Sequence, residues 1–245
     1  HIIILLVGTI IALICKVSFS YILLGYLAYA IFFYFVNLPV ALGWTGYVMQ
    51  FVLHKPRLAF PMYRFALKHK ARCSSPLIAY GLHLLEDCQY PEALRTFEYV
   101  ITLPKINPTM LKFARQDLAI AYWKNGDLAT GISTLEQMQK DYDIFNLEFY
   151  TTLGYFYIEA GEYDKATDIS NQALLEDESY GPAYDNLAQI QYRQGNLEEA
   201  ESLFLKALEL RDTMVDSKFY LGLIHEKQGD AEGARTFFTA AHNSK

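Results

Sequence analysis

The sequence predicts an all-α protein in which N-terminal transmembrane helices precede a helical solenoid of about five repeats. Glycines recur at one constant interval, at Gly161, Gly195 and Gly229. Two series of alanines keep the same period: Ala166, Ala200 and Ala234, and Ala173, Ala207 and Ala241. Residues 1–85 contain no Asp or Glu, whereas residues 86–245 contain all 27 acidic residues. A repeating acidic region therefore follows an apolar region with a different environment.

Each repeat is predicted to be a pair of helices joined at a glycine. A residue with positive φ ends the first helix most easily when it is glycine. Small residues recur where the two helices of a pair must approach closely: Gly154, Ala188 and Gly222 on the first helices. Acidic residues follow each glycine, at the N-terminus of the second helix, where their negative charge interacts favourably with the helix dipole. One pair cannot bury its apolar face alone, so neighbouring pairs are expected to stack.

Two less regular copies precede these three. One is marked by Leu118, Ala119, Tyr122, Gly126, Gly131, Leu135 and Met138, and the other by Gly81, Leu84, Cys88, Ala93 and Phe97. In the second copy, Cys88 stands at the position of the turn glycine. Ala59, Tyr63 and Ala66 lie one full period before Ala93, Phe97 and Val100, so Arg57–Lys70 is expected to be a lone half-unit.

The first 53 residues are predicted to be a membrane region. From Ile2 to Leu53 the only formal charge is Lys16, and this length exceeds the roughly 20 residues of one span. We expect two full spans, at Ile2–Ile14 and Phe19–Val36, with Val40–Leu53 at the interface or completing a tilted third. The chain begins with His1, so its true start is expected to lie further upstream. Residues 54–72 are predicted to be a basic juxtamembrane helix or half-repeat, and residues 73–245 the solenoid domain.

The charge next to the apolar block predicts the topology. Six basic residues and no acidic residue occur within 18 positions: Lys55, Arg57, Arg64, Lys68, Lys70 and Arg72. The positive-inside rule makes this flank cytoplasmic, which predicts an inner or plasma membrane protein with a cytoplasmic solenoid. The same cluster can contact anionic head groups, so membrane lipids are expected partners of residues 1–72. The alternative is the opposite topology, an extracytoplasmic assembly or quality-control factor.

Catalytic and metal-binding patterns are not expected in this chain. The six histidines are scattered without an HExxH arrangement, and neither a phosphate-binding loop nor a GxSxG sequence occurs. We therefore predict no enzymatic activity, no cofactor and no metal. The three cysteines, Cys15, Cys73 and Cys88, form no CxxC pair and are expected to be free thiols. Residues 86–245 hold 27 acidic and 14 basic residues, a net charge of −13 that disfavours nucleic acid as a partner.

The 34-residue period with these glycines and alanines resembles the tetratricopeptide repeat (TPR) family over residues 74–243. The resemblance implies a protein partner, a peptide or a helix, bound in a concave groove that the first helices line. Carried over by register, the groove residues are expected to be Phe113, Gln116, Ile120, Trp123, Thr151, Tyr155, Ile158, Asp185, Gln189, Tyr192, Phe219, Leu223 and Glu226.

These residues bear on the kind of partner. The Lys and Asn residues with which one TPR subgroup holds a terminal carboxylate are absent at Gln116, Thr151 and Asp185. The aromatic members instead predict apolar anchors for a partner helix, or, as the alternative, packing inside the solenoid. The layout resembles membrane-anchored bacterial TPR proteins that assemble envelope machinery, including exopolysaccharide synthases. We therefore expect a membrane-tethered scaffold that recruits or organises a membrane-associated complex.

Overall fold

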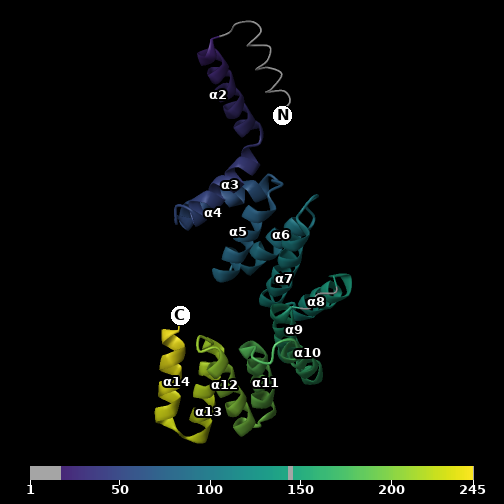
Figure 1. Ribbon diagram of the computed structural model, residues 1–245, viewed down its shortest axis with the longest axis vertical. Coiled ribbons are helices and arrows are strands. Elements are labelled where there is room, and N and C mark those ends of the chain that lie inside the picture. Colours follow the sequence, from purple (N-terminus) through teal and green to yellow (C-terminus); the bar gives the residue numbers. More distant parts are fainter. Residues whose placement is uncertain (1–17, 143–145, 245) are drawn as a thin grey trace. The chain divides into compact units, whose positions relative to one another are not determined.

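The computed structural model describes residues 18–142 and 146–244, and it is helical throughout apart from turns and connecting loops (Figure 1). The expected span Ile2–Ile14 lies outside the described residues. The helices are α2 (Phe19–Val36), α3 (Leu38–Phe51), α4 (Pro56–Lys68), α5 (Ser74–Glu86), α6 (Tyr90–Ile101), α7 (Pro108–Lys124), α8 (Leu128–Tyr142), α9 (Leu147–Ala160), α10 (Tyr163–Glu176), α11 (Gly181–Gln194), α12 (Leu197–Leu210), α13 (Val215–Gln228) and α14 (Ala231–Asn243).

The chain divides into two compact units. Unit 1 contains residues 1–88 and 95–110, and unit 2 contains residues 89–94 and 111–245. In unit 2 the helices form the pairs α7–α8, α9–α10, α11–α12 and α13–α14. Ala166 and Ala200 on the second helices have no exposed surface, and Ala234 is 6% exposed. The predicted period therefore corresponds to a structural repeat, in which a small residue of the second helix packs against the first: Gly131 in α7–α8 and an alanine in the other three pairs.

The turns explain why glycine recurs once in every repeat. Gly161, Gly195 and Gly229 end α9, α11 and α13 in the left-handed conformation, with φ of 77°, 88° and 83°. Cys88 follows α5 and adopts the same conformation, with φ of 58°. A side chain is strained in this region, so Cys88 carries a conformational cost that the glycines avoid.

Unit 1 contains a further helix pair in the same register. α4 packs against α3, and its Ala59, Tyr63 and Ala66 have no exposed surface. His54, between α3 and α4, has a φ of 51° and lies one full period before Cys88. A Cβ at Gly46 would lie 3.1 Å from the Tyr63 ring, so glycine is what lets α3 approach α4. The half-unit predicted at Arg57–Lys70 is thus not alone, because α3 is its first helix.

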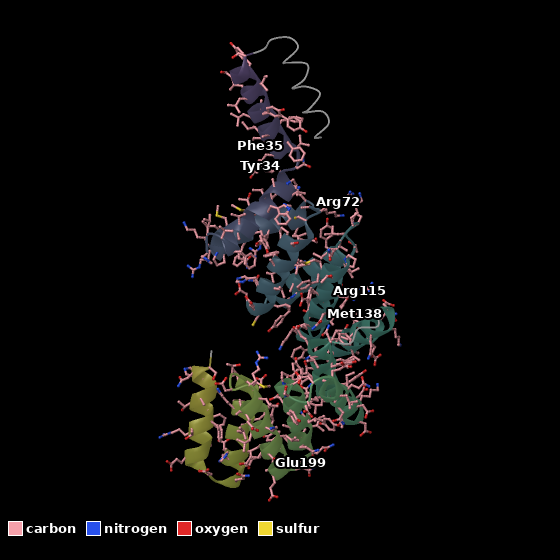
Figure 2. All side chains as sticks on the ribbon, in the orientation of Figure 1. Tyr34, Phe35, Arg72, Arg115, Met138 and Glu199 are labelled. Atoms are coloured by element: carbon pink, nitrogen blue, oxygen red, sulfur yellow. The ribbon has the colours of Figure 1, made fainter. Side chains whose placement is uncertain are left out.

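The helix α2 covers the predicted apolar run Phe19–Val36 and ends where Asn37 was expected to break it. Its described side chains are largely exposed, and Figure 2 shows Tyr34 and Phe35 projecting from its surface. By length and composition of the described residues, none of the helices would cross a membrane alone. The pair α2 and α3, bent by 94° at Asn37, passes the same test together.

Two of the three cysteines are described, and both are free thiols. Cys73 is buried, and this burial raises the pKa of its thiol to about 11. Cys88 is exposed at its turn.

Candidate functional site

All thirteen predicted groove residues lie on the first helices of unit 2. Phe113, Gln116, Ile120 and Trp123 are on α7; Thr151, Tyr155 and Ile158 on α9; Asp185, Gln189 and Tyr192 on α11; Phe219, Leu223 and Glu226 on α13. We call the side of these four helices that carries the thirteen residues the first-helix face; Ile158, Asp185 and Gln189 are buried within it. Contacts between α7 and α9, α9 and α11, and α11 and α13 place the four helices side by side, as described below.

The α7–α9 part of this face is an aromatic pair. The rings of Trp123 and Tyr155 meet edge to face, with centroids 5.3 Å apart. Lys124 Nζ lies 3.7 Å from the Trp123 ring centroid, and Phe156 supports the indole from inside, at 5.4 Å. Burial, together with Glu159, raises the pKa of the Tyr155 hydroxyl to about 12. Both rings are half-buried, so each has a packed edge and an accessible edge.

A second aromatic pair joins α11 to α13. Tyr192 and Tyr220 meet edge to face with centroids 5.1 Å apart, and Lys227 Nζ lies 4.1 Å from the Tyr192 ring centroid. Tyr220 in turn stacks on the fully buried Phe204 of α12, with ring planes only 8° apart. Both pairs therefore combine a half-buried aromatic with a neighbouring lysine, an arrangement stabilised by cation–π attraction.

An ion pair connects the two aromatic pairs. Arg193 Nη2 of α11 donates to a carboxylate oxygen of Glu159 on α9. The Arg193 guanidinium also interacts with the Tyr220 hydroxyl of α13, where its charge opposes the rise that burial causes in the pKa of Tyr220. One side chain thus connects three successive first helices. Glu159 and Arg193 occupy the same position in neighbouring repeats, 34 residues apart.

Between α11 and α13 lies a buried carboxylate. Asp185 is only 6% exposed, and it accepts hydrogen bonds from Ser217 Oγ and from Gln189 Nε2, the latter at 2.8 Å. No ion pair to this carboxylate is formed within residues 18–142 and 146–244. Burial raises the pKa of Asp185 to about 6, although both hydrogen bonds oppose the shift. Gln189 Oε1 is buried and receives no hydrogen bond from any described residue.

The other predicted groove residues range from fully buried to exposed. Ile158 has no exposed surface, whereas Phe113 and Phe219 are 52% and 47% exposed. Gln116 Nε2 donates to the Thr152 hydroxyl at 3.2 Å, which ties α7 to α9. The Thr151 hydroxyl is bonded within its own helix, and the backbone oxygen of Thr151 accepts from Asn186 Nδ2 at 3.0 Å. Ile120 and Leu223 are half-buried, and Glu226 is exposed.

Four residues that shape this face were not predicted: Glu159, Arg193, Ser217 and Tyr220. Glu159 and Arg193 had a readable signal, because opposite charges at the same position of successive repeats can form an ion pair. Ser217 and Asp185 are 32 residues apart, so the period does not align them. Within the described part of the chain, no group of three or more His, Cys, Asp or Glu side chains is placed to hold a metal ion.

Comparison with known proteins addresses the repeat itself. Two tetratricopeptide repeat models match residues 146–213 and 186–244. Superkiller protein 3 of Schizosaccharomyces pombe is 26% identical over 191 residues, which is 74% of this chain and 13% of that protein. The uncharacterized protein ycf37 of Pyropia yezoensis is 39% identical over 70 residues, 29% of this chain and 39% of that protein. The chain thus spans less than half the length of these curated relatives.

A solved structure shows the same fold. The structure of PilF from Pseudomonas aeruginosa superimposes with a TM-score of 0.55 at 15% identity, covering 70% of this chain and 76% of that one. The glycines in the left-handed conformation and the buried alanines recur with the period of the repeat that the two family models describe. Residues 146–244 of this chain are tetratricopeptide repeats.

Proposed function

We propose that the protein is a membrane-tethered scaffold that binds a partner protein on the first-helix face of unit 2. TPR proteins generally serve as interaction scaffolds, and residues 146–244 of this chain match two models of that family. One observation carries the choice of this face: Trp123, Tyr155 and Tyr192 lie on successive first helices, and each of them is half-buried. Large aromatics with one packed edge are the residues that most often anchor a partner. No enzymatic step is part of the proposal.

The charged side chains beside the aromatic anchors indicate what kind of partner fits the first-helix face. Lys124 and Lys227 lie beside the aromatic anchors Trp123 and Tyr192, and Glu159 pairs with Arg193 between α9 and α11. A helix or extended peptide with apolar side chains and a few charges of both signs is complementary to this surface. The acidic character of residues 86–245 makes nucleic acid an unsuitable ligand.

The test is a paired measurement on Trp123→Ala, Tyr155→Ala and Tyr192→Ala. Loss of a binding anchor should lower capture of cross-linked partners from cells by roughly thirtyfold, about 2 kcal/mol, with a normal thermal midpoint. Loss of a core residue would instead lower the free energy of unfolding by about 3–5 kcal/mol. Tyr184→Ala is the matched control, because its hydroxyl bonds the connecting loop at Glu178. Stable variants that retain every partner would refute the assignment.

Membrane tethering is supported by α2, whose side chains are apolar, largely exposed and uncharged over 18 residues. The basic residues that follow favour a cytoplasmic position for the repeats after residue 72, by the positive-inside rule. A cysteine introduced at Ser244 in a cysteine-free background should resist an impermeant reagent in intact cells and react after permeabilisation. Labelling of intact cells would favour the alternative, an extracytoplasmic assembly or quality-control factor. The comparisons do not support a role in exopolysaccharide assembly, so the proposal leaves the pathway open.

A further inference from the structure

The two sides of α3 differ in what covers them. One side packs on α4 and α5, where Gly43 and Gly46 are buried and a Cβ at Gly43 would lie 2.7 Å from Cys73 Sγ. The outer side carries Trp44, Val48 and Phe51, which are 47%, 43% and 49% exposed, and Phe51 also borders a pocket lined by Ile78 of α5. These three residues are spaced by four and three positions, so they form one continuous stripe along the helix. A helix in contact with water on that side would carry polar residues there.

The bend at Asn37 sets the direction of the α3 axis. α2 and α3 meet at 94°. α2 has 18 residues and is therefore about 27 Å long, close to the roughly 30 Å of a hydrocarbon core. If α2 lies along the membrane normal, as the proposed tethering requires, α3 lies parallel to the membrane surface. Trp44 is then at the depth where tryptophan is enriched in membrane proteins.

The α3–α4 pair also carries a uniform charge. Lys55, Arg57 and Lys68 are exposed on the turn and on α4, away from the fully buried Ala59 and Tyr63. Residues 1–85 contain no carboxylate side chain to balance them. The turn itself is apolar at Phe51, Val52 and Leu53, and the Lys55 backbone N–H donates to Met49 O at 2.8 Å, which folds the turn back on α3. Cations on long flexible stems beside exposed apolar residues suit a surface of anionic head groups.

We propose that the α3–α4 pair docks on an anionic lipid surface. The stripe of Trp44, Val48 and Phe51 lies in the boundary between head groups and acyl chains, as amphipathic interfacial helices do. Lys55, Arg57 and Lys68 contact the lipid phosphates. The inference rests on the proposed tethering and adds to it, because docking fixes α3 and α4 against the membrane, whereas α2 alone would leave them attached only through Asn37.

The test uses the full chain reconstituted into vesicles, with a fluorophore on a single cysteine and quenchers attached to the lipid chains. A probe at Val48 should be quenched in vesicles that contain phosphatidylglycerol, and less so in pure phosphatidylcholine. A probe at Leu27 on α2 should be quenched in both, and a probe at the exposed Glu98 on α6 in neither. Quenching at Leu27 without quenching at Val48 would overturn the docking inference alone. Absence of quenching at both positions would also overturn the tethering.

A charge-neutral variant tests whether the basic residues recognise anionic lipid. The triple variant Lys55→Gln, Arg57→Gln and Lys68→Gln should lower quenching at Val48 in anionic vesicles to the level found in neutral ones, while the Leu27 probe stays quenched. All three side chains are exposed, so the variant should fold normally. Quenching at Val48 that ignores both the variant and the lipid charge would refute the recognition of anionic lipid. A Val48 probe that stays in water in every vesicle would assign the stripe to a protein partner instead.

Discussion

Replacing Asp185 by asparagine should change how the stability of the protein depends on pH. Burial raises the pKa of this carboxyl from 3.8 to about 6. Because the pKa is higher in the folded protein than in the unfolded chain, the folded state holds the proton more tightly between about pH 4 and pH 6. The contribution of Asp185 to the free energy of unfolding is therefore largest at low pH and is lost as pH rises through about 6.

The structure sets the size of the effect. A pKa difference of about 2 units corresponds to about 3 kcal/mol, at 1.36 kcal/mol per unit. Asparagine cannot ionise, so this amount of pH dependence should be absent from Asp185→Asn. The new amide can accept from Ser217 and, after rotation of the Gln189 amide, donate to the unpaired Gln189 Oε1. We therefore expect the variant to be more stable than the unmodified protein at pH 7.

The assay is urea unfolding in mild detergent, followed by circular dichroism between about pH 4 and pH 7.5. The stability difference between Asp185→Asn and the unmodified protein should grow by up to about 3 kcal/mol across this range. Burial also raises the pKa of Asp117, to about 7. Its contribution to the pH dependence is the same in both proteins and cancels in the difference. Asp212→Asn is the control, because Asp212 is exposed and its variant should show a flat difference. If the stability difference between Asp185→Asn and the unmodified protein did not change with pH, the raised pKa of the buried Asp185 carboxyl would be refuted.

Further substitutions test the repeat. Cys88→Gly should stabilise the protein by about 1 kcal/mol, because glycine removes the cost of a side chain at φ of 58°. Cys88→Ser keeps the strain and should leave the thermal midpoint unchanged; a gain from serine as large as from glycine would contradict the backbone explanation. Ala200→Leu should overpack a position with no exposed surface and cost roughly 1–3 kcal/mol. An unchanged thermal midpoint for Ala200→Leu would show that the register is wrong. Gly46→Val should separate α3 from α4, since its side chain would meet the Tyr63 ring, and proteolysis at the α3–α4 turn should increase.

The repeat could be predicted because each of its constraints involves one residue. Gly195 is needed for positive φ and Ala200 for close approach, and both recur wherever the same backbone recurs. The α3–α4 pair was only half predicted. Its second helix keeps Ala59 and Tyr63 in register, but the first helix replaces the usual pattern with an apolar sequence that resembles a membrane segment. Gly43 and Gly46 were the available signals of close packing.

The first-helix face was predicted as a set of positions, while its chemistry was not. Which side of Tyr155 or Tyr192 is packed depends on neighbours from other helices, and one sequence does not specify them. The pairing of Asp185 with Ser217 depends on the rotation of α13 against α11, since the two residues are not at equivalent repeat positions. The membrane boundary at residue 53, the groove assignment and the cytoplasmic location stay predictions, and the experiments above address them.

The single side chain that joins three first helices has a mechanical consequence. Arg193 pairs with Glu159 on α9 and interacts with the Tyr220 hydroxyl on α13, so it restrains the spacing of three helices. A stack of repeats bends by small rotations between neighbours, and any change in its curvature must stretch or compress this link. A ligand that widened the spacing of α9, α11 and α13 would have to break a charged contact, whereas one that keeps the spacing would not. The cost of breaking the contacts of Arg193 therefore favours partners that bind the stack without changing its curvature.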